Sequence, residues 1–391
     1  MKAASAPRSA SLHRVLVVET GGVGALRPAS ALPELLRAGD LVVVNDAATL
    51  PATLYARTAD RDPVELRLVG GTGSDDARVC FAAALLGAGD YHTRTEDRPL
   101  PPRVVAGDVL RIGSELEARV RGASAISSRL LDIELRATDA DDVASTWSAL
   151  YRAGKPVQYA HVPDALALWD VQNAWAGRPW AVEMPSAGRA LRVETLLELR
   201  RRGVEIAFIT HAAGLSATGD PAIDAKLPLP ERFEVGEAAV RAVQRTRARG
   251  GRVVAVGTSV VRALESAARD EVLRATTGVT DLRLGLTTIR HVVDGLLTGV
   301  HEADTTHFEL LRAFAEHAVL DDALAAAERE GLLGHELGDA WLVWGSPATS
   351  AVAARAERAR CAASSCVESG PFAARGTRDG RGCRAASSSC R

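Results

Sequence analysis

The feature that most constrains the fold is a change of hydrophobic pattern along the chain. From about Leu54 to Arg136, short segments in which apolar and polar residues alternate are separated by Gly, Pro and Asp. After Trp147, apolar residues recur at helical spacing, and each such stretch is followed by a short apolar run. Alternation with frequent turns is typical of a small all-β unit, and helices alternating with apolar strands are typical of an α/β sheet. The sequence therefore predicts an α/β domain interrupted by a small β-barrel.

We expect the α/β domain to be discontinuous and barrel-like, formed by residues 12–55 and 147–345, with the inserted β-barrel at 56–146. The run LVVV at residues 41–44 has no polar alternation, so it should be a strand covered on both faces. Residues 346–391 are rich in Ala, Arg, Ser and Gly and show no sustained apolar periodicity, which predicts a disordered tail.

Charge and cysteine usage limit the class of protein. The formal net charge of -2 gives no global basic field, so a nucleic-acid partner would need a local patch. The densest basic stretch is Arg200–Arg202 with Arg189 and Arg192, although such runs are more often a solvated helix face. Only Cys80 lies outside the predicted tail, and neither a signal peptide nor a membrane-spanning run is present. We therefore expect a cytoplasmic protein with no membrane partner.

Polar residues that could carry chemistry follow two predicted strands. Asn45 and Asp46 come directly after residues 41–44, and His211 follows the run VEIAFIT. Ligands of α/β folds gather at the carboxyl ends of strands, where Asp46 could bind sugar hydroxyls or take a proton. His211 is the side chain there that could exchange a proton near neutral pH. The alternatives are a turn-forming Asn-Asp pair and a histidine bonded to a local carbonyl.

The segment RVVAVGTSVVRALES predicts a strand that ends at Gly257 and a helix that opens with Thr258 and Ser259. Free N–H groups and hydroxyls at a helix N-terminus can bind an anion. Arg262 and Glu265 follow about one turn later and could add charged contacts. The alternative is a capped connection with a surface ion pair.

Three histidines, His291, His301 and His307, lie close together in the sequence. Their spacing does not match HExxH or another tight metal-binding pattern. We therefore expect no metal site.

Several segments, in this order, resemble the S-adenosylmethionine:tRNA ribosyltransferase-isomerase family of queuosine biosynthesis. LVVVNDAATLPATL is similar to its strand-Asn-Asp segment, EMPSAGRAL to its Ala-Pro-Thr-Ala-Gly-Leu-His, and RVVAVGTSVVRALES to a family pattern throughout. VVDGLLTGVH resembles Val-Val-Asp-(Ala/Gly)-Leu-Leu-Thr-Asn-Phe-His, and GKPVQYAHVP resembles a Gly-His-(Ile/Val)-Pro region. The resemblance covers roughly residues 15–345 and identifies the chain as a divergent member.

The resemblance implies a transferase that uses S-adenosylmethionine as ribosyl donor and isomerises the ribosyl group on a 7-aminomethyl-7-deazaguanine of tRNA, without a metal. It implies an α/β, barrel-like domain with an inserted β-barrel. The residues that it assigns to substrate binding are Gln172, Ser186, Gly188, Gly257, Thr258, Ser259, Arg262 and Glu265. Asp46, His211 and His301 are the candidates for ribose contact and proton removal. The expected partners are S-adenosylmethionine and tRNA, and we expect a monomer.

Departures from the family pattern keep two other functions open. The family histidine after Ala-Gly-Leu is Ala190 here, and His211 is displaced by one position. The Pro-Lys after the final histidine is Ala303-Asp304. One alternative is therefore an enzyme that uses S-adenosylmethionine with a small-molecule acceptor, and the other is a non-catalytic binding protein on the same scaffold.

Overall fold

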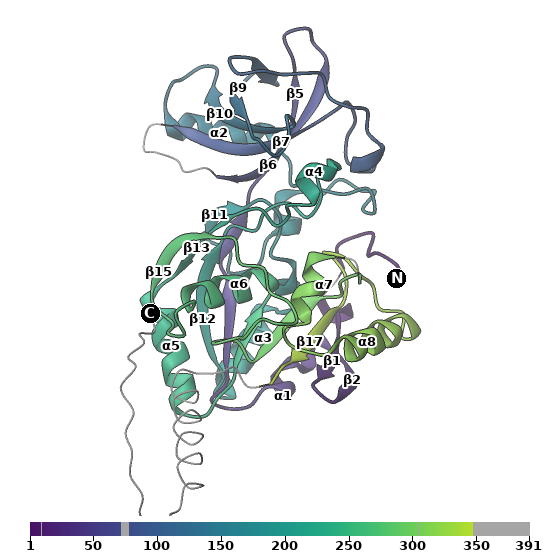
Figure 1. The fold of residues 1–391 in the computed structure, drawn as a ribbon, viewed down its shortest axis with the longest axis vertical. Coiled ribbons are helices and arrows are strands. Elements are labelled where there is room, and N and C mark those ends of the chain that lie inside the picture. The colour runs from purple at the N-terminus through teal and green to yellow at the C-terminus, as the bar shows by residue number, and fades with distance from the viewer. Residues whose placement is uncertain (9, 72–77, 304, 347–391) are drawn as a thin grey trace, which may run out of the picture. The chain divides into compact units, whose positions relative to one another are not determined.

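The apolar run at residues 41–44 forms strand β3 (Leu41–Asn45), an inner strand of a nine-stranded sheet (Figure 1). This computed structural model describes residues 1–8, 10–71, 78–303 and 305–346. Strand β3 pairs in parallel with β12 (Glu205–His211) on one side and β14 (Val253–Val256) on the other. Strand β16 (Gly295–Gly299) extends the parallel set beyond β14. The carboxyl ends of four strands therefore meet at one edge of the sheet.

The sheet has the open order β15-β13-β12-β3-β14-β16-β17-β1-β2. Its outer strands introduce antiparallel pairs, between β12 and β13, β13 and β15, β16 and β17, and β1 and β2. Their bounds are β13 (Glu231–Val235), β15 (Thr276–Thr280), β17 (Ala340–Trp344), β1 (Arg14–Glu19) and β2 (Gly22–Pro28).

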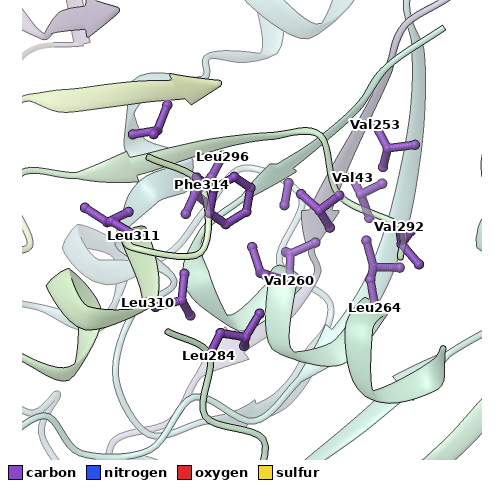
Figure 2. Close-up of a cluster of buried hydrophobic side chains, with 14 of the residues drawn as sticks. Val43, Val253, Val260, Leu264, Leu284, Val292, Leu296, Leu310, Leu311 and Phe314 are labelled. Atoms are coloured by element: carbon purple, nitrogen blue, oxygen red, sulfur yellow. The ribbon is translucent and has the colours of Figure 1, made fainter. Parts of the chain in front are cut away.

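Side chains of β3 are buried on both faces of the sheet, as the unbroken apolar run predicts. Leu41 and Val43 pack in one core cluster with residues of α6, whereas Val42 and Val44 pack in a second cluster with residues of α1 and α3. Figure 2 shows the first cluster, in which Val260 and Leu264 of α6 lie beside Val43 and Val253. The helices are α1 (Leu32–Leu35), α3 (Val193–Arg201), α5 (Glu237–Ala248), α6 (Thr258–Ala267), α7 (Thr306–Leu311) and α8 (His317–Arg329).

The region of alternating segments forms a closed β-barrel in the order β10-β7-β6-β5-β8-β9, so the predicted inserted barrel is confirmed. Its inward side chains form their own core cluster. The strands are β5 (Thr53–Arg57), β6 (Pro63–Gly71), β7 (Val79–Leu86), β8 (Val109–Ile112), β9 (Leu116–Ala123) and β10 (Leu130–Ala137).

Helix α2 (Val143–Ala153) follows the last barrel strand and is capped by Asp142, whose carboxylate accepts from the N–H of Ser145 at 2.9 Å. It buries Ala149 and Leu150 in the barrel core, so the helix crosses the expected boundary at residue 146. The domain boundaries at 56 and 146 stay a prediction. Apart from Ser346, the predicted disordered tail lies outside the described residues.

Short elements complete the connections. Strand β4 (Ala47–Thr49) pairs in parallel with β11 (Arg178–Ala181) and forms a second, two-stranded sheet. No helix within the described ranges is long and apolar enough to cross a bilayer. The remaining elements are α4 (Pro221–Asp224) and 3-10 turns at Ala10–Leu12, Ala29–Ala31, Thr95–Asp97, Leu168–Val171 and Ser186–Ala190.

Candidate functional site

Asn45 joins the carboxyl ends of β3 and β12. Its Nδ2 donates to the carbonyl of His211 at 2.9 Å, and its Oδ1 accepts from the N–H of His211 at 2.9 Å and of Ala47 at 3.0 Å. A buried amide is stable only when its donors and acceptors are used, and this one is used by both strands. Asn45 therefore sets the position of His211 and of the next residue, Asp46.

Asp46 lies at this edge with a half-buried side chain. Its Oδ1 accepts a 2.6 Å hydrogen bond from the hydroxyl of Thr210, which precedes His211 on β12. The backbone carbonyl of Asp46 accepts from the N–H of Gly177 at 2.8 Å. Thr210 thus orients the carboxylate, Gly177 holds the backbone, and the side chain remains partly accessible.

The N-terminus of α6 opens at the same edge. Gly257 adopts a φ of +93°, which favours glycine, and no side chain caps the helix. Thr258 and Ser259 are half-buried, and Oγ of Ser259 lies 3.5 Å from Nδ2 of Asn45. The first N–H groups of a helix have no partner within the helix, so this end suits an anion.

The 3-10 turn Ser186–Ala190 lies against this helix end. A methyl group on Gly257 would stand 3.5 Å from Cβ of Ala187. Gly188 has no room for a side chain, since a Cβ would come within 2.6 Å of the side-chain atoms of Asn173. Ser186 is half-buried in the same turn, so the structure brings this predicted segment beside Gly257.

The side-chain amide of Gln172 is hydrogen-bonded to the backbone of Thr49. Its Oε1 accepts from the N–H of Thr49 at 2.9 Å, and its Nε2 donates to the carbonyl of Thr49 at 2.8 Å. The side chain therefore continues the pairing of β4 and holds the segment after Asp46. The predicted substrate contact of Gln172 stays a prediction, and the structure adds that its amide positions Thr49.

Arg262 was predicted to bind substrate, with a surface ion pair as the alternative; the structure contradicts the surface pair and places the side chain in the core. Its side chain is buried, with 6% exposure, and Nη1 donates to Oε2 of Glu231 on β13. Its Nε donates to the carbonyl of Leu282 at 2.9 Å. The helix turns this residue toward the core, where β13 supplies the partner carboxylate. Arg262 therefore ties α6 to the outer part of the sheet.

Glu265 is also engaged inside the protein. Its carboxylate accepts from three consecutive backbone N–H groups, at 2.8, 3.1 and 2.9 Å, in the segment before β16. With 4% exposure it has no route to a ligand in this structure. The predicted substrate contact is corrected to a structural role, which sequence spacing could not show because the partners lie more than twenty residues away.

His211 has an exposure of 0%, and neither ring nitrogen has a hydrogen-bond partner among the described residues. Its Nε2 lies 3.4 Å from Oε2 of Glu231. Burial and the charge of Arg262 lower the pKa of His211 to about 3, while burial raises the pKa of Glu231. The imidazole is therefore neutral at neutral pH and a weak proton acceptor.

His301 follows the carboxyl end of β16 and stacks on His307, with ring centroids 4.8 Å apart. Its Nε2 lies 2.7 Å from the hydroxyl of Thr298. Burial, and then the neighbouring His307, hold the pKa of His301 well below its usual value. His301 thus lies at the carboxyl end of β16 as a neutral imidazole.

Two glutamates of helix α3 pair with part of the predicted basic stretch. Arg201 and Arg202 both pair with Glu198, and Arg192 pairs with Glu194. Arg189 donates to the carbonyl of Asp170 at 2.7 Å. The solvated-face alternative therefore describes this stretch better than a phosphate-binding patch.

Two groups of polar residues near this edge were not predicted as site residues from the sequence. Glu183 accepts from the hydroxyl of Tyr159 and, at 2.5 Å, from the hydroxyl of Ser216. His161, His335 and Glu336 form the group of described residues that could hold a metal ion. The AHVP motif pointed to the segment of His161, but no local pattern links it to residues 335 and 336.

Comparisons with known proteins identify the family to which this chain belongs. The family model described as queuosine biosynthesis protein matches residues 1–343. An S-adenosylmethionine:tRNA ribosyltransferase-isomerase of Anaeromyxobacter sp. is 33% identical over 345 residues, covering 86% of this chain and 93% of the relative. The protein of the same name from Acidithiobacillus ferrooxidans is 35% identical over 320 residues, covering 80% and 85%. A solved S-adenosylmethionine tRNA ribosyltransferase structure from Thermotoga maritima covers 87% of this chain and 95% of its own, at 23% identity and a TM-score of 0.46.

The match spans both the sheet that carries the candidate site and the inserted barrel. Relatives above 30% identity cover most of the chain. This chain belongs to the queuosine biosynthesis protein family, together with the S-adenosylmethionine:tRNA ribosyltransferase-isomerases.

Proposed function

We propose that this chain is an enzyme with the activity for which its relatives are named. It transfers the ribosyl group of S-adenosylmethionine to tRNA and isomerises it, with a 7-aminomethyl-7-deazaguanine as the acceptor base. The observation that carries this proposal is the family match along nearly the whole described chain. S-adenosylmethionine is a substrate, the transfer step requires no metal, and one copy of the chain suffices.

We place the methionine carboxylate of the donor at the N-terminus of α6. Two features support this placement. The uncapped end at Gly257 leaves the N–H groups of Thr258 and Ser259 for an anion. The turn Ser186–Ala190 lies against the same end and can close one side of the ligand.

Asp46 is the residue that we assign to ribose contact and proton removal. The sulfonium acidifies the neighbouring C–H, so a modest base is adequate. Asp46 is partly accessible and is oriented by Thr210. His211 and His301 are the other candidates, but burial keeps both rings neutral and lowers their capacity to accept a proton. We assign these two histidines to shaping the site.

The test combines turnover with donor binding. Adenine and methionine release should be measured by mass spectrometry with precursor tRNA, with unmodified tRNA and without tRNA. We expect release only with precursor tRNA. Asp46→Asn should lower turnover by at least about a hundredfold, the scale of a lost general base, while calorimetric binding of S-adenosylmethionine stays near normal.

Asp60→Asn is the matched control, because Asp60 is an exposed turn residue near the start of β6. It should leave turnover unchanged. Unchanged turnover in Asp46→Asn would remove Asp46 from the chemistry. Release that depends on a small-molecule amine, and not on tRNA, would favour the small-molecule alternative.

A further inference from the structure

Three potential metal ligands meet beside the candidate site, although two of them lie far from the third in sequence. His161 follows helix α2 and the turn after it, whereas His335 and Glu336 lie in the turn before β17. One ligand atom from each of the three lies within 4.8 Å of the others. The rings of His161 and His335 are 4.6 Å apart.

The geometry of one pair already fits a shared ion. Nε2 of His161 and Oε2 of Glu336 are 3.2 Å apart. Zinc binds His nitrogen and carboxylate oxygen at about 2.0–2.2 Å, so two tetrahedral ligands of one ion stand roughly 3.3 Å from each other. His335 needs only a side-chain adjustment of about 1–2 Å to join them at this ligand spacing, and its exposed position allows it.

The backbone of His335 is a second observation that a simple ion pair does not explain. His335 has a φ of +65°, in the left-handed region that disfavours a residue with a side chain. The turn holds it there through a 3.0 Å hydrogen bond from the N–H of Gly338 to its carbonyl. Such conformations are concentrated at ligand-binding and active sites. An ion pair between His161 and Glu336 alone would give no reason for this backbone conformation of His335.

Carboxylates around the cluster favour a cation. Oε1 of Glu302 lies 3.6 Å from Nε2 of His335 and adds negative charge beside the ring. Burial and the charge of Glu336 raise the pKa of Glu183 to about 7. A divalent ion next to Glu336 would offset this repulsion between carboxylates.

We propose that His161, His335 and Glu336 form a binding site for a divalent transition-metal ion of the zinc type. Two imidazole nitrogens and one carboxylate oxygen are ligands that Zn²⁺ and Co²⁺ accept, and the remaining position is open to water. The ion ties the segment of His161 to the turn before β17. The inference is independent of the proposed function, because the ion takes no part in the transfer step.

The test uses the untagged full chain and Co²⁺ as a spectroscopic probe. Cys361, Cys366, Cys383 and Cys390 are first replaced together by Ser, so that tail thiolates cannot bind the probe. We expect one Co²⁺ per chain, with visible absorption and without the thiolate band. His161→Ala and His335→Ala should each weaken binding at least about tenfold.

The matched control is His317→Ala, which removes an exposed histidine paired with Asp321. It should leave Co²⁺ binding unchanged. Absence of binding at millimolar Co²⁺, or equal binding by the His161→Ala, His335→Ala double variant, would overturn the proposal.

A measurement on the unsubstituted chain avoids variants that fail to fold. Zn²⁺ should protect His161 and His335, but not His317, from carbethoxylation by diethylpyrocarbonate, as read by peptide mass spectrometry. Equal modification of all three with and without Zn²⁺ would also reject the site.

Discussion

Replacing Arg262 by Ala should destabilise the fold far more than it weakens donor binding. The guanidinium is buried and donates to Glu231 and to the carbonyl of Leu282. Its removal leaves the Glu231 carboxylate buried beside the neutral ring of His211, with a 2.7 Å hydrogen bond from the N–H of Gly214 as its remaining partner. Breaking a buried pair from one side costs about 3–5 kcal/mol, because the charge left behind stays out of water.

The assay is urea unfolding at neutral pH, followed by circular dichroism. Arg241→Ala is the matched control, because Arg241 pairs with Glu237 on the surface of α5 with side-chain exposures of 60% and 69%. Exposed pairs of this kind contribute at most about 1 kcal/mol. We therefore expect the unfolding free energy of Arg262→Ala to fall about 2–5 kcal/mol further than that of the control.

A paired substitution separates the lost pair from lost packing. Arg262→Met with Glu231→Met removes both charges and keeps apolar volume, so it should recover much of the stability that Arg262→Ala loses. A cost for Arg262→Ala no larger than that of Arg241→Ala would refute this reasoning. Unchanged stability with weakened S-adenosylmethionine binding would restore the direct contact expected from the sequence.

Two further predictions test His211 and Gly188. The pKa of His211 is lowered from 6.5 to about 3, so the unfolded chain takes up the proton first as the pH falls. The neutral ring therefore contributes its full share of the unfolding free energy above pH 6.5, and this share, at most about 5 kcal/mol, is lost as the pH falls toward 3. His211→Gln should flatten the pH dependence of the urea midpoint. Identical slopes in the two proteins would contradict this. Gly188→Ala should lower the unfolding free energy by about 1–3 kcal/mol, because its Cβ would meet Asn173. Gly21→Ala is the control, because a Cβ at Gly21 meets open space, and it should change the unfolding free energy by no more than about 0.5 kcal/mol. Equal melting temperatures of the two variants would count against the close approach at Gly188.

The sequence alone determined the class of fold and indicated the edge of the sheet where we place the candidate site. A strand buried on both faces is apolar throughout, and a strand buried on one face alternates apolar with polar residues. The apolar run at 41–44 therefore predicted a covered strand, and the alternating segments before Trp147 predicted a barrel. The turn at Gly257 was readable for a similar reason, because a positive φ selects glycine locally. Such signals depend on neighbouring residues and need no tertiary contact.

Tertiary structure alone decided which side chains remain available for chemistry. Arg262 and Glu265 carry charges that spacing assigns to a surface, yet β13 and the segment before β16 supply their partners inside the core. His211 became a buried neutral ring through the same packing. His161 and Glu336 are 175 residues apart and lie 3.2 Å from each other, a proximity that no local period records. Pairing between distant segments depends on how the sheet orders its strands, and short-range patterns in the sequence do not encode that order.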